Sequence, residues 1–218
     1  DLNDAGGRFK VIKAYQAHIK VYCTIGFTGG IIAFLFLSHS IWPYLVIPAI
    51  LAGAYVVPIP GIGRRLRDYP LLKIFVLAVT WAFLTVCVPA LSSGQSEIQT
   101  IVPMYLERAA LIFALTIPFD IRDASADDKN GVRTLPNVIG FRYSKMAGIL
   151  ALSLSASLGT YLYLSGTYSA MFLGGSIAVY IVTAALVAFS NPDRSDYYFT
   201  GAVDGMMILL YLVALLSF

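Results

Sequence analysis

Seven long apolar stretches, separated by polar connections, limit what this chain can fold into more than any other feature. A helix that crosses a bilayer takes about 17 to 25 mainly apolar residues, because its backbone polar groups must be paired within the segment. We therefore predict an all-α fold, a polytopic transmembrane helical bundle that forms a single domain over residues 1–218. Its seven helices are expected at approximately 21–37, 42–59, 71–91, 101–119, 146–164, 168–189 and 197–217.

The composition excludes an ordinary soluble domain. Hydrophobic residues make up 58% of the chain and charged residues only 12%, whereas soluble domains carry about a quarter charged residues. Cys23 and Cys87 lie within apolar stretches, and His18 and His39 lack partners at metal-ligand spacing. A disulfide framework or a Cys/His metal site is therefore not indicated, and no nucleic-acid partner is expected.

The cationic residues are distributed very unevenly over the connections. Of the 15 Lys and Arg residues, 14 lie on one side: 13 precede the first stretch or lie in the connections after the second, fourth and sixth stretches, and Lys73 lies at the start of the third stretch. The other three connections carry none. By the positive-inside rule, the cationic side is cytoplasmic. This places the N-terminus inside and the C-terminus outside.

The polar segment from residue 120 to 140 carries the chemistry that the sequence suggests. If the fourth helix continues beyond the membrane, Asp120, Asp123 and Asp127 lie on one face of it. Oxygen ligands without His or Cys suit Mg²⁺, which takes one or two carboxylates together with waters and phosphate oxygens. Nearby cations would attract a diphosphate, and these are Arg122, Lys129 and Arg133. Gly131 and Pro136 are expected to end the helix.

The same segment resembles the second aspartate-rich motif of the UbiA-type intramembrane prenyltransferase superfamily. That motif has the form Asp-x-x-x-Asp-x-x-x-Gly-x-x-Thr, often with Arg before the first Asp and Leu after the Thr. The matching positions here are Arg122, Asp123, Asp127, Gly131, Thr134 and Leu135. Asp120 extends the motif where similar family members often have Asn. The alternative for such a segment is an ordinary solvated loop.

A second resemblance lies at the start of the third apolar stretch. Family members often carry Tyr-Pro-x-x-Lys there with a Trp further along the helix, and this chain has Tyr69, Pro70, Lys73 and Trp81. The resemblance implies that Lys73 faces the substrate diphosphate, with Arg67 close by. Without the resemblance, Lys73 reads as a snorkelling interface anchor.

The resemblance also implies a wider set of expectations. The family has nine transmembrane helices, and this chain is similar to helices three to nine, so we expect an N-terminally incomplete chain that lacks the first two helices and the first Asn-Asp-x-x-Asp motif. The implied activity is the transfer of a prenyl group from an allylic diphosphate to an aromatic or lipid acceptor, as in quinone biosynthesis. Mg²⁺ is the implied cofactor, and the bacterial inner membrane is the implied location.

In that reaction, each group of candidate residues has an expected role. Asp120, Asp123 and Asp127 would hold the metal, while Lys73 and the arginines stabilise the departing diphosphate. A pocket walled by helices would keep water from the allylic cation. Asp123, Asp127 and Lys73 are the expected catalytic residues.

Three other functions are weighed against this one. A degenerate family member would bind an isoprenoid diphosphate without turnover, or act as a membrane assembly partner, and this alternative stays open. A CDP-alcohol phosphotransferase needs Asp-Gly, but Ile121 and Ala124 follow the candidate aspartates. A transporter is disfavoured because no matching Gly/Pro-broken helix pair is present.

Several charged residues fall inside or beside the apolar stretches. Glu107, Arg108 and Asp204 are costly at such depth and must face a cavity or a partner. For the first two, an inter-helix ion pair is the structural interpretation, and for Asp204 it is an interhelical hydrogen bond. Asp193 and Asp196 either line a pocket mouth or belong to a solvated loop.

Overall fold

The computed structural model describes residues 15–61, 63, 65–66, 69, 71–94, 97–129 and 131–217, with the backbone alone at Ser40. These residues form helices and connections, with no strand among them. Six helices are long and apolar enough to cross a membrane. The expected polytopic helical bundle is therefore confirmed at that level. The chain divides into two compact units, Asp1–Trp42 and Pro43–Phe218, which are described separately. The single domain over residues 1–218 stays a prediction.

The first unit contains the apolar helix α2 (Gln16–Phe36) and the 3-10 turn η1 (His39–Ile41). No residue of α2 is buried, which is what a helix surrounded by lipid requires of its side chains. The helix ends where Leu37 takes an extended conformation. The Trp42 ring then stacks on Phe34 at a centroid distance of 5.1 Å and lies 4.7 Å from the ring of His39. His39 is thus part of an aromatic turn.

Helix α3 (Trp42–Val56) is shorter than the stretch predicted at 42–59. Its 15 residues rise about 22 Å, less than the roughly 30 Å of a hydrocarbon core. The helix stops because Pro58 and Pro60 follow, and a residue before proline is driven out of the helical region. The number of sufficiently long helices in the described ranges is therefore six rather than the predicted seven.

The third apolar stretch forms three consecutive elements, α4 (Leu72–Ala82), the π-helical turn η3 (Phe83–Cys87) and α5 (Val88–Ser92). Pro89 explains the wide turn. It has no N–H for the carbonyl of Thr85, and its ring would clash with that carbonyl in a regular helix. A π-turn before the proline opens the backbone and removes the conflict.

Helix α6 (Ile98–Lys129) has 32 residues and is about 48 Å long, so it extends well past a hydrocarbon core. The helix is continuous through Lys129, so the condition under which the three candidate aspartates share one helix face is met. The helix ends in a Schellman motif, in which Val132 N–H donates to the Asp127 carbonyl at 2.8 Å and Gly131 N–H to the Asp128 carbonyl at 3.0 Å. Gly131 has the required positive φ of 71°. The predicted helix stop at this glycine is therefore correct.

Three further spans complete the second unit. Helix α7 (Leu135–Leu164) starts earlier than the predicted 146–164 and is kinked at Gly140, where φ is 81°. Pro136 lies in its first turn, a position where proline is preorganised for the helix. Helix α8 (Ala170–Phe189) follows, and the π-helical η4 (Tyr198–Val203) continues directly into α9 (Asp204–Leu216).

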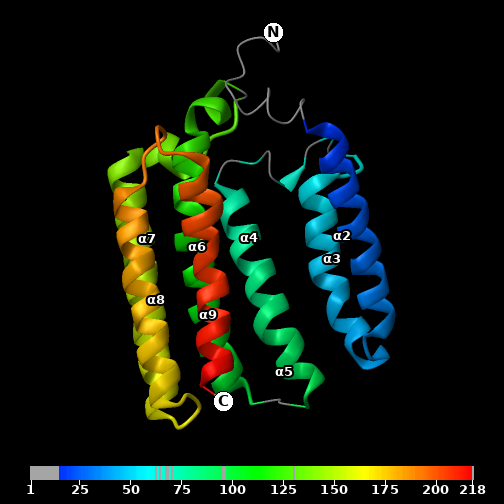
Figure 1. Cartoon of the computed structure of the whole chain (residues 1–218), viewed down its shortest axis with the longest axis vertical. Coiled ribbons are helices and arrows are strands. Elements are labelled where there is room, and N and C mark those ends of the chain that lie inside the picture. The colour runs from blue at the N-terminus through cyan, green and yellow to red at the C-terminus, as the bar shows by residue number, and fades with distance from the viewer. Residues whose placement is uncertain are drawn as a thin grey trace. The chain divides into compact units, whose positions relative to one another are not determined.

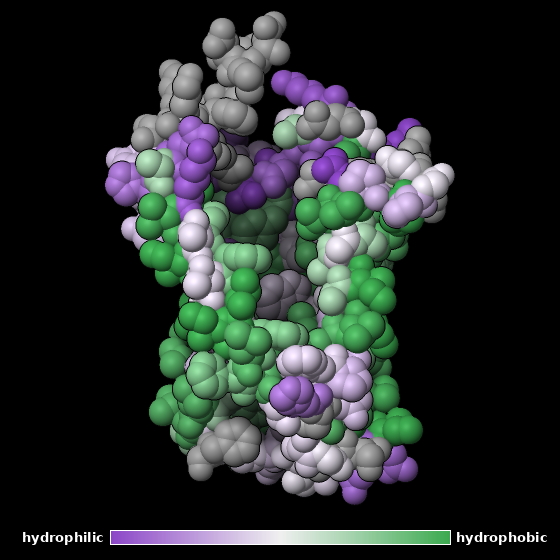
Figure 2. Space-filling view, turned by 90° about the vertical axis from the view of Figure 1, so that its right-hand side faces the viewer, coloured by the Kyte–Doolittle hydropathy of each residue, from purple (hydrophilic) through white to green (hydrophobic). Residues whose placement is uncertain are grey.

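The core of the second unit forms where α6 contacts α4, α7, α8 and η4. Figure 1 shows α6, α7, α8 and α9 running side by side. One cluster of buried side chains joins α6 to α7, α8, η4 and α9. A second cluster joins α4, α6 and α8 through Ile74, Ile117, Ile121 and Val187. Hydrophobic side chains cover the middle of the face seen in Figure 2, and hydrophilic ones gather towards the ends.

One end of the second unit is called the charged end below. Here α4 begins, α6 ends, α7 begins, α8 ends and η4 begins (Figure 1). It collects most of the described Lys, Arg and Asp side chains of this unit, which lie on the ends of these helices and in the connections between them. The sequence places the candidate diphosphate site at this end.

Candidate functional site

The three candidate aspartates of α6, Asp120, Asp123 and Asp127, lie on the last turns of the helix. Asp120 is buried, with only 3% of its surface exposed. Asp123 and Asp127 are half-buried. Burying a carboxylate costs several kcal/mol unless an opposite charge or hydrogen bonds compensate it. The compensation comes from two different cations.

Lys73 on α4 provides the first of these cations. Its Nζ lies 3.0 Å from Oδ1 of Asp120 and 3.4 Å from Oδ2 of Asp127. The ammonium therefore sits between two carboxylates that are seven residues apart on the facing helix. Such a pair is stabilised relative to either charge alone, because removing one partner leaves the other uncompensated at the protein interior. Lys73 thus faces the aspartate segment, and its expected role towards a substrate diphosphate stays a prediction.

The start of α4 is shaped to bring Lys73 to this position. Leu71, which precedes the helix, has a φ of 62°, a conformation that is strained for a residue with a branched side chain. Its N–H donates to the carbonyl of Arg133 at 3.2 Å. One turn into the helix, Ile74 is buried against Ile117 and Ile121 of α6. Backbone pairing and core packing therefore fix Lys73 from both sides.

The second cation is Arg122, which neighbours Asp123 on α6. Its Nε and Nη2 donate to the two carboxylate oxygens of Asp123 at 2.8 and 2.9 Å. The guanidinium also lies over the rings of Phe119 and Phe199, at 5.0 and 5.2 Å from their centroids. Bidentate pairing and stacking on aromatic rings are the interactions that distinguish Arg from Lys. Arg122 is therefore held by Asp123 and two rings, and Asp204 contributes further electrostatic attraction.

The carboxylates do not meet at a single point. Asp120 and Asp127 converge on Lys73, whereas Asp123 turns to Arg122. Among the described residues, no group of three or more His, Cys, Asp or Glu side chains is arranged to hold a metal ion. The expected three-ligand arrangement of Asp120, Asp123 and Asp127 is therefore absent from this conformation.

The chemistry of the site nevertheless fits a magnesium–diphosphate pair. Mg²⁺ takes only one or two protein carboxylates when phosphate oxygens supply the rest. Asp120 and Asp127 already share one cation, the ammonium of Lys73, so a metal ion could be shared by the same two carboxylates. Thr134 adds a second observation, because its buried Oγ1 has no hydrogen-bond partner in the described structure. A buried hydroxyl without a partner is uncommon, and Thr134 belongs to the segment that resembles the family motif.

Among the described residues, the other cations predicted to bind the diphosphate are not paired with the aspartates. Lys129 and Arg133 are exposed after the aspartates, and neither makes an ion pair within the part of the chain that the structure describes. They remain available to an anion at the charged end. Arg67 lies outside the described residues.

Comparison with known proteins gives no match. No family model, no curated protein and no solved structure matches this chain. What the chain does must therefore be argued from its own residues.

One buried polar cluster was not predicted from the sequence. Glu107 on α6 is 1% exposed and accepts hydrogen bonds from the hydroxyls of Tyr168 at 2.6 Å and Tyr180 at 2.5 Å. The inter-helix ion pair expected for Glu107 and Arg108 is not formed among the described residues, where two tyrosine hydroxyls satisfy the Glu107 carboxylate instead. Gly159 leaves room for the carboxylate, since a Cβ there would lie 3.2 Å from Oε1. The sequence feature that could have indicated this cluster is the presence of Tyr168 and Tyr180 within an apolar stretch, where a tyrosine hydroxyl needs a hydrogen-bond partner.

The predictions for the last connection are partly resolved. Asp193 and Asp196 are exposed, and Asp193 lines a pocket at the end of α8 together with Lys145 and Arg194. Asp204 is exposed on α9, and its carboxylate is attracted by the positive charge of Arg122.

Proposed function

We propose that this chain is a Mg²⁺-dependent intramembrane prenyltransferase of the UbiA type. It would transfer a prenyl group from an allylic diphosphate to an acceptor that is expected to be aromatic. The observation that carries the proposal is the position of Lys73 between Asp120 and Asp127. This ion pair joins the start of α4 to the end of α6, the two segments whose sequences resemble the family motifs.

The charged end would bind the diphosphate, and the apolar helices would take the isoprenoid. Lys73 is the nearest cation to the carboxylate pair, and Lys129 and Arg133 lie exposed beyond it. A bound metal would neutralise charge on the leaving diphosphate, and Asp120 and Asp127 are the carboxylates placed to hold it. Arg122 would keep Asp123 oriented beside them. The ion pair that Lys73 now makes would open when substrate arrives, which frees the ammonium for a phosphate oxygen.

The chain's contribution to the chemical step is charge stabilisation and exclusion of water. The carbon–oxygen bond breaks with its electron pair on the diphosphate, and Lys73 stabilises that oxygen. The allylic cation bonds to an acceptor carbon, which then loses a proton. Apolar helices around the reacting carbon keep out water that would convert the cation to an alcohol. A membrane setting also accommodates the long apolar tail, and by the positive-inside rule the site would face the cytoplasm of a bacterial inner membrane.

The experiment is diphosphate release from a labelled prenyl diphosphate by the purified chain with Mg²⁺. We expect Asp127→Asn to lower release by about 100-fold or more, the scale of losing a principal charge-stabilising group. Asp128→Asn is the matched control, because this neighbouring carboxylate is exposed and removes the same charge from the same helix. Equal release by both variants would contradict the proposal.

A second candidate function has one observation in its favour. In the described conformation, cationic side chains already pair with all three aspartates, which suits a chain that binds an isoprenoid diphosphate without turnover or serves as an assembly partner. Equilibrium binding of the labelled diphosphate separates the two. Binding that is tight and independent of Mg²⁺, with no release, would favour this second function.

A further inference from the structure

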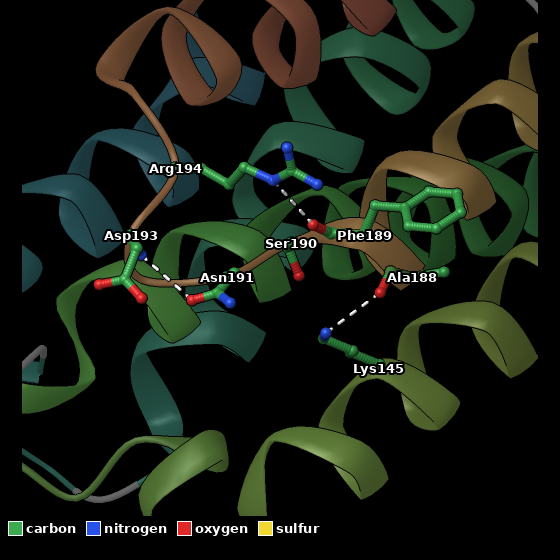
Figure 3. A pocket seen from close by; sticks show the side chains of 7 residues that line it. All are labelled: Lys145, Ala188, Phe189, Ser190, Asn191, Asp193 and Arg194. Carbon is green, nitrogen blue, oxygen red and sulfur yellow. Dashed lines mark hydrogen bonds between the residues drawn. The ribbon is translucent and has the colours of Figure 1, made fainter.

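A pocket at the charged end lies apart from the carboxylates of α6. It has a volume of about 450 Å³ and lies where α7 approaches the end of α8 and the following connection. Small-molecule sites typically have volumes of about 300–1,000 Å³. We call it the α7–α8 pocket. It is lined by Lys145, Ala188, Phe189, Ser190, Asn191, Asp193 and Arg194 (Figure 3).

Two cations reach the last turn of α8 from different elements. Lys145 Nζ donates to the carbonyl of Ala188 at 3.1 Å, and Arg194 Nε donates to the carbonyl of Phe189 at 3.2 Å. These bonds satisfy carbonyls that the helix end leaves free, and positive charge is favoured there. Each bond uses one N–H of a group that has three or more. Both cations therefore keep donors for another acceptor.

The positive charge of this pocket is not neutralised by the protein. Lys73 and Arg122 form ion pairs, whereas neither Lys145 nor Arg194 does so in the described ranges. Asp193 is the acidic residue of the pocket, and its N–H is bound to the Asn191 side chain. In Figure 3 its carboxylate lies at the left end of the connection, away from the Arg194 guanidinium and the Lys145 ammonium. An anion can therefore approach the two cations without meeting that carboxylate.

The pocket also has an apolar side. Phe189 ends α8 with 66% of its surface exposed, and its ring extends from the pocket in Figure 3. Lys145 and Arg194 both flank apolar spans at the level where these spans leave the membrane. Lipid headgroups lie at that level, with acyl chains directly beneath them. Paired cations beside an exposed aromatic ring match a phosphate that carries an acyl chain better than a free one.

We propose that the α7–α8 pocket binds the phosphate group of an anionic membrane lipid, held between Lys145 and Arg194. Basic pockets between transmembrane helices are used in this way for anionic headgroups. The Arg194 guanidinium lies over the Tyr198 ring at 5.4 Å, a contact that restrains this side chain. The site is separate from the proposed diphosphate site and does not depend on turnover.

The experiment measures lipid retention by the full chain with native mass spectrometry. The purified protein is equilibrated with phosphatidylglycerol or phosphatidylcholine, and the bound lipid is counted. We expect phosphatidylglycerol to be retained preferentially, and each of Lys145→Gln and Arg194→Gln to weaken it by about fivefold, the usual contribution of one cation near an anionic surface. Glutamine keeps an N–H for the α8 carbonyl, so the helix end stays capped while the charge is lost.

The matched control is Arg142→Gln, which removes one positive charge three residues away on the same helix from an exposed side chain outside the pocket. It should retain phosphatidylglycerol like the parent chain, as should the charge-conserving Lys145→Arg. Inorganic phosphate added as a competitor tests the source. If inorganic phosphate leaves the amount of bound phosphatidylglycerol unchanged, the site is assigned to a lipid phosphate. If inorganic phosphate displaces the lipid, the same two cations are assigned to phosphate from solution. Equal retention by the Lys145, Arg194 and Arg142 variants would overturn the proposal.

Discussion

Nζ of Lys73 on α4 lies 3.0 Å from Oδ1 of Asp120 on α6, and the carboxylate has almost no exposed surface. The pair joins two helices that are otherwise held by apolar packing around Ile74. A buried carboxylate depends on its partner far more than an exposed one does. The two residues therefore contribute to stability as well as to the proposed site.

Replacing Lys73 by Met should destabilise the chain by about 3 kcal/mol, at the lower end for a broken buried pair because Lys73 is partly exposed. The methionine fills the volume but leaves Asp120 without its cation. Thermal unfolding in detergent, without substrate, measures the effect. The double variant with Asp120→Asn should recover part of the loss, because the buried charge is then gone. Strictly additive losses would show that the two side chains are not coupled.

Replacing Arg122 by Lys should cost about 1–2 kcal/mol although the charge is kept. Lysine cannot donate to both oxygens of Asp123, nor lie flat between the rings of Phe119 and Phe199. The midpoint of thermal unfolding reports the change. Arg142→Lys is the control, since Arg142 is exposed and surface substitutions usually stay within about 0.5 kcal/mol. Similar midpoints for the two variants would argue against a stabilising interaction of Arg122 with Asp123 and the two rings.

Removing the Tyr180 hydroxyl should destabilise the bundle by about 1–3 kcal/mol, the range for a lost hydrogen bond to a buried polar or charged group. Tyr180→Phe leaves Glu107 with the single hydroxyl of Tyr168. Tyr211→Phe makes the same chemical change at a side chain that is 61% exposed and should have little effect. Chemical denaturation of both variants in parallel provides the comparison.

Adjacent glycines on α8 should respond in opposite directions to alanine. A Cβ at Gly175 would lie 2.5 Å from Cγ1 of Val213 on α9, whereas a Cβ at Gly174 meets nothing within 4 Å. Gly175→Ala should cost about 1–3 kcal/mol through overpacking, and Gly174→Ala should be neutral or stabilise by up to about 1 kcal/mol. The midpoint of thermal unfolding of each variant measures these effects. Adding Val213→Ala to Gly175→Ala should restore part of the lost stability.

The local pattern of the chain was enough to predict most of its helices. Apolar length indicated the spans, and Gly131 indicated where α6 would end, whereas the start of α7 at Leu135 was not predicted. Pro58 and Pro60 could have indicated that α3 would end at Val56. The prediction extended the helix to residue 59 because the apolar stretch continues past Val56. The π-turn before Pro89 was less accessible, because a proline inside a helix allows several local adjustments.

The sequence by itself determined that the chain is a helical membrane protein and that three aspartates follow one another along a single helix face, because these properties depend on residues within a few turns. Only the tertiary structure decided which cation meets which carboxylate. Lys73 reaches Asp120 across the contact between α4 and α6, and Glu107 accepts hydrogen bonds from two tyrosines on the α8 side instead of forming an inter-helix ion pair. Such pairings depend on helix rotation and depth, which are set by the packing of side chains that lie far apart along the chain.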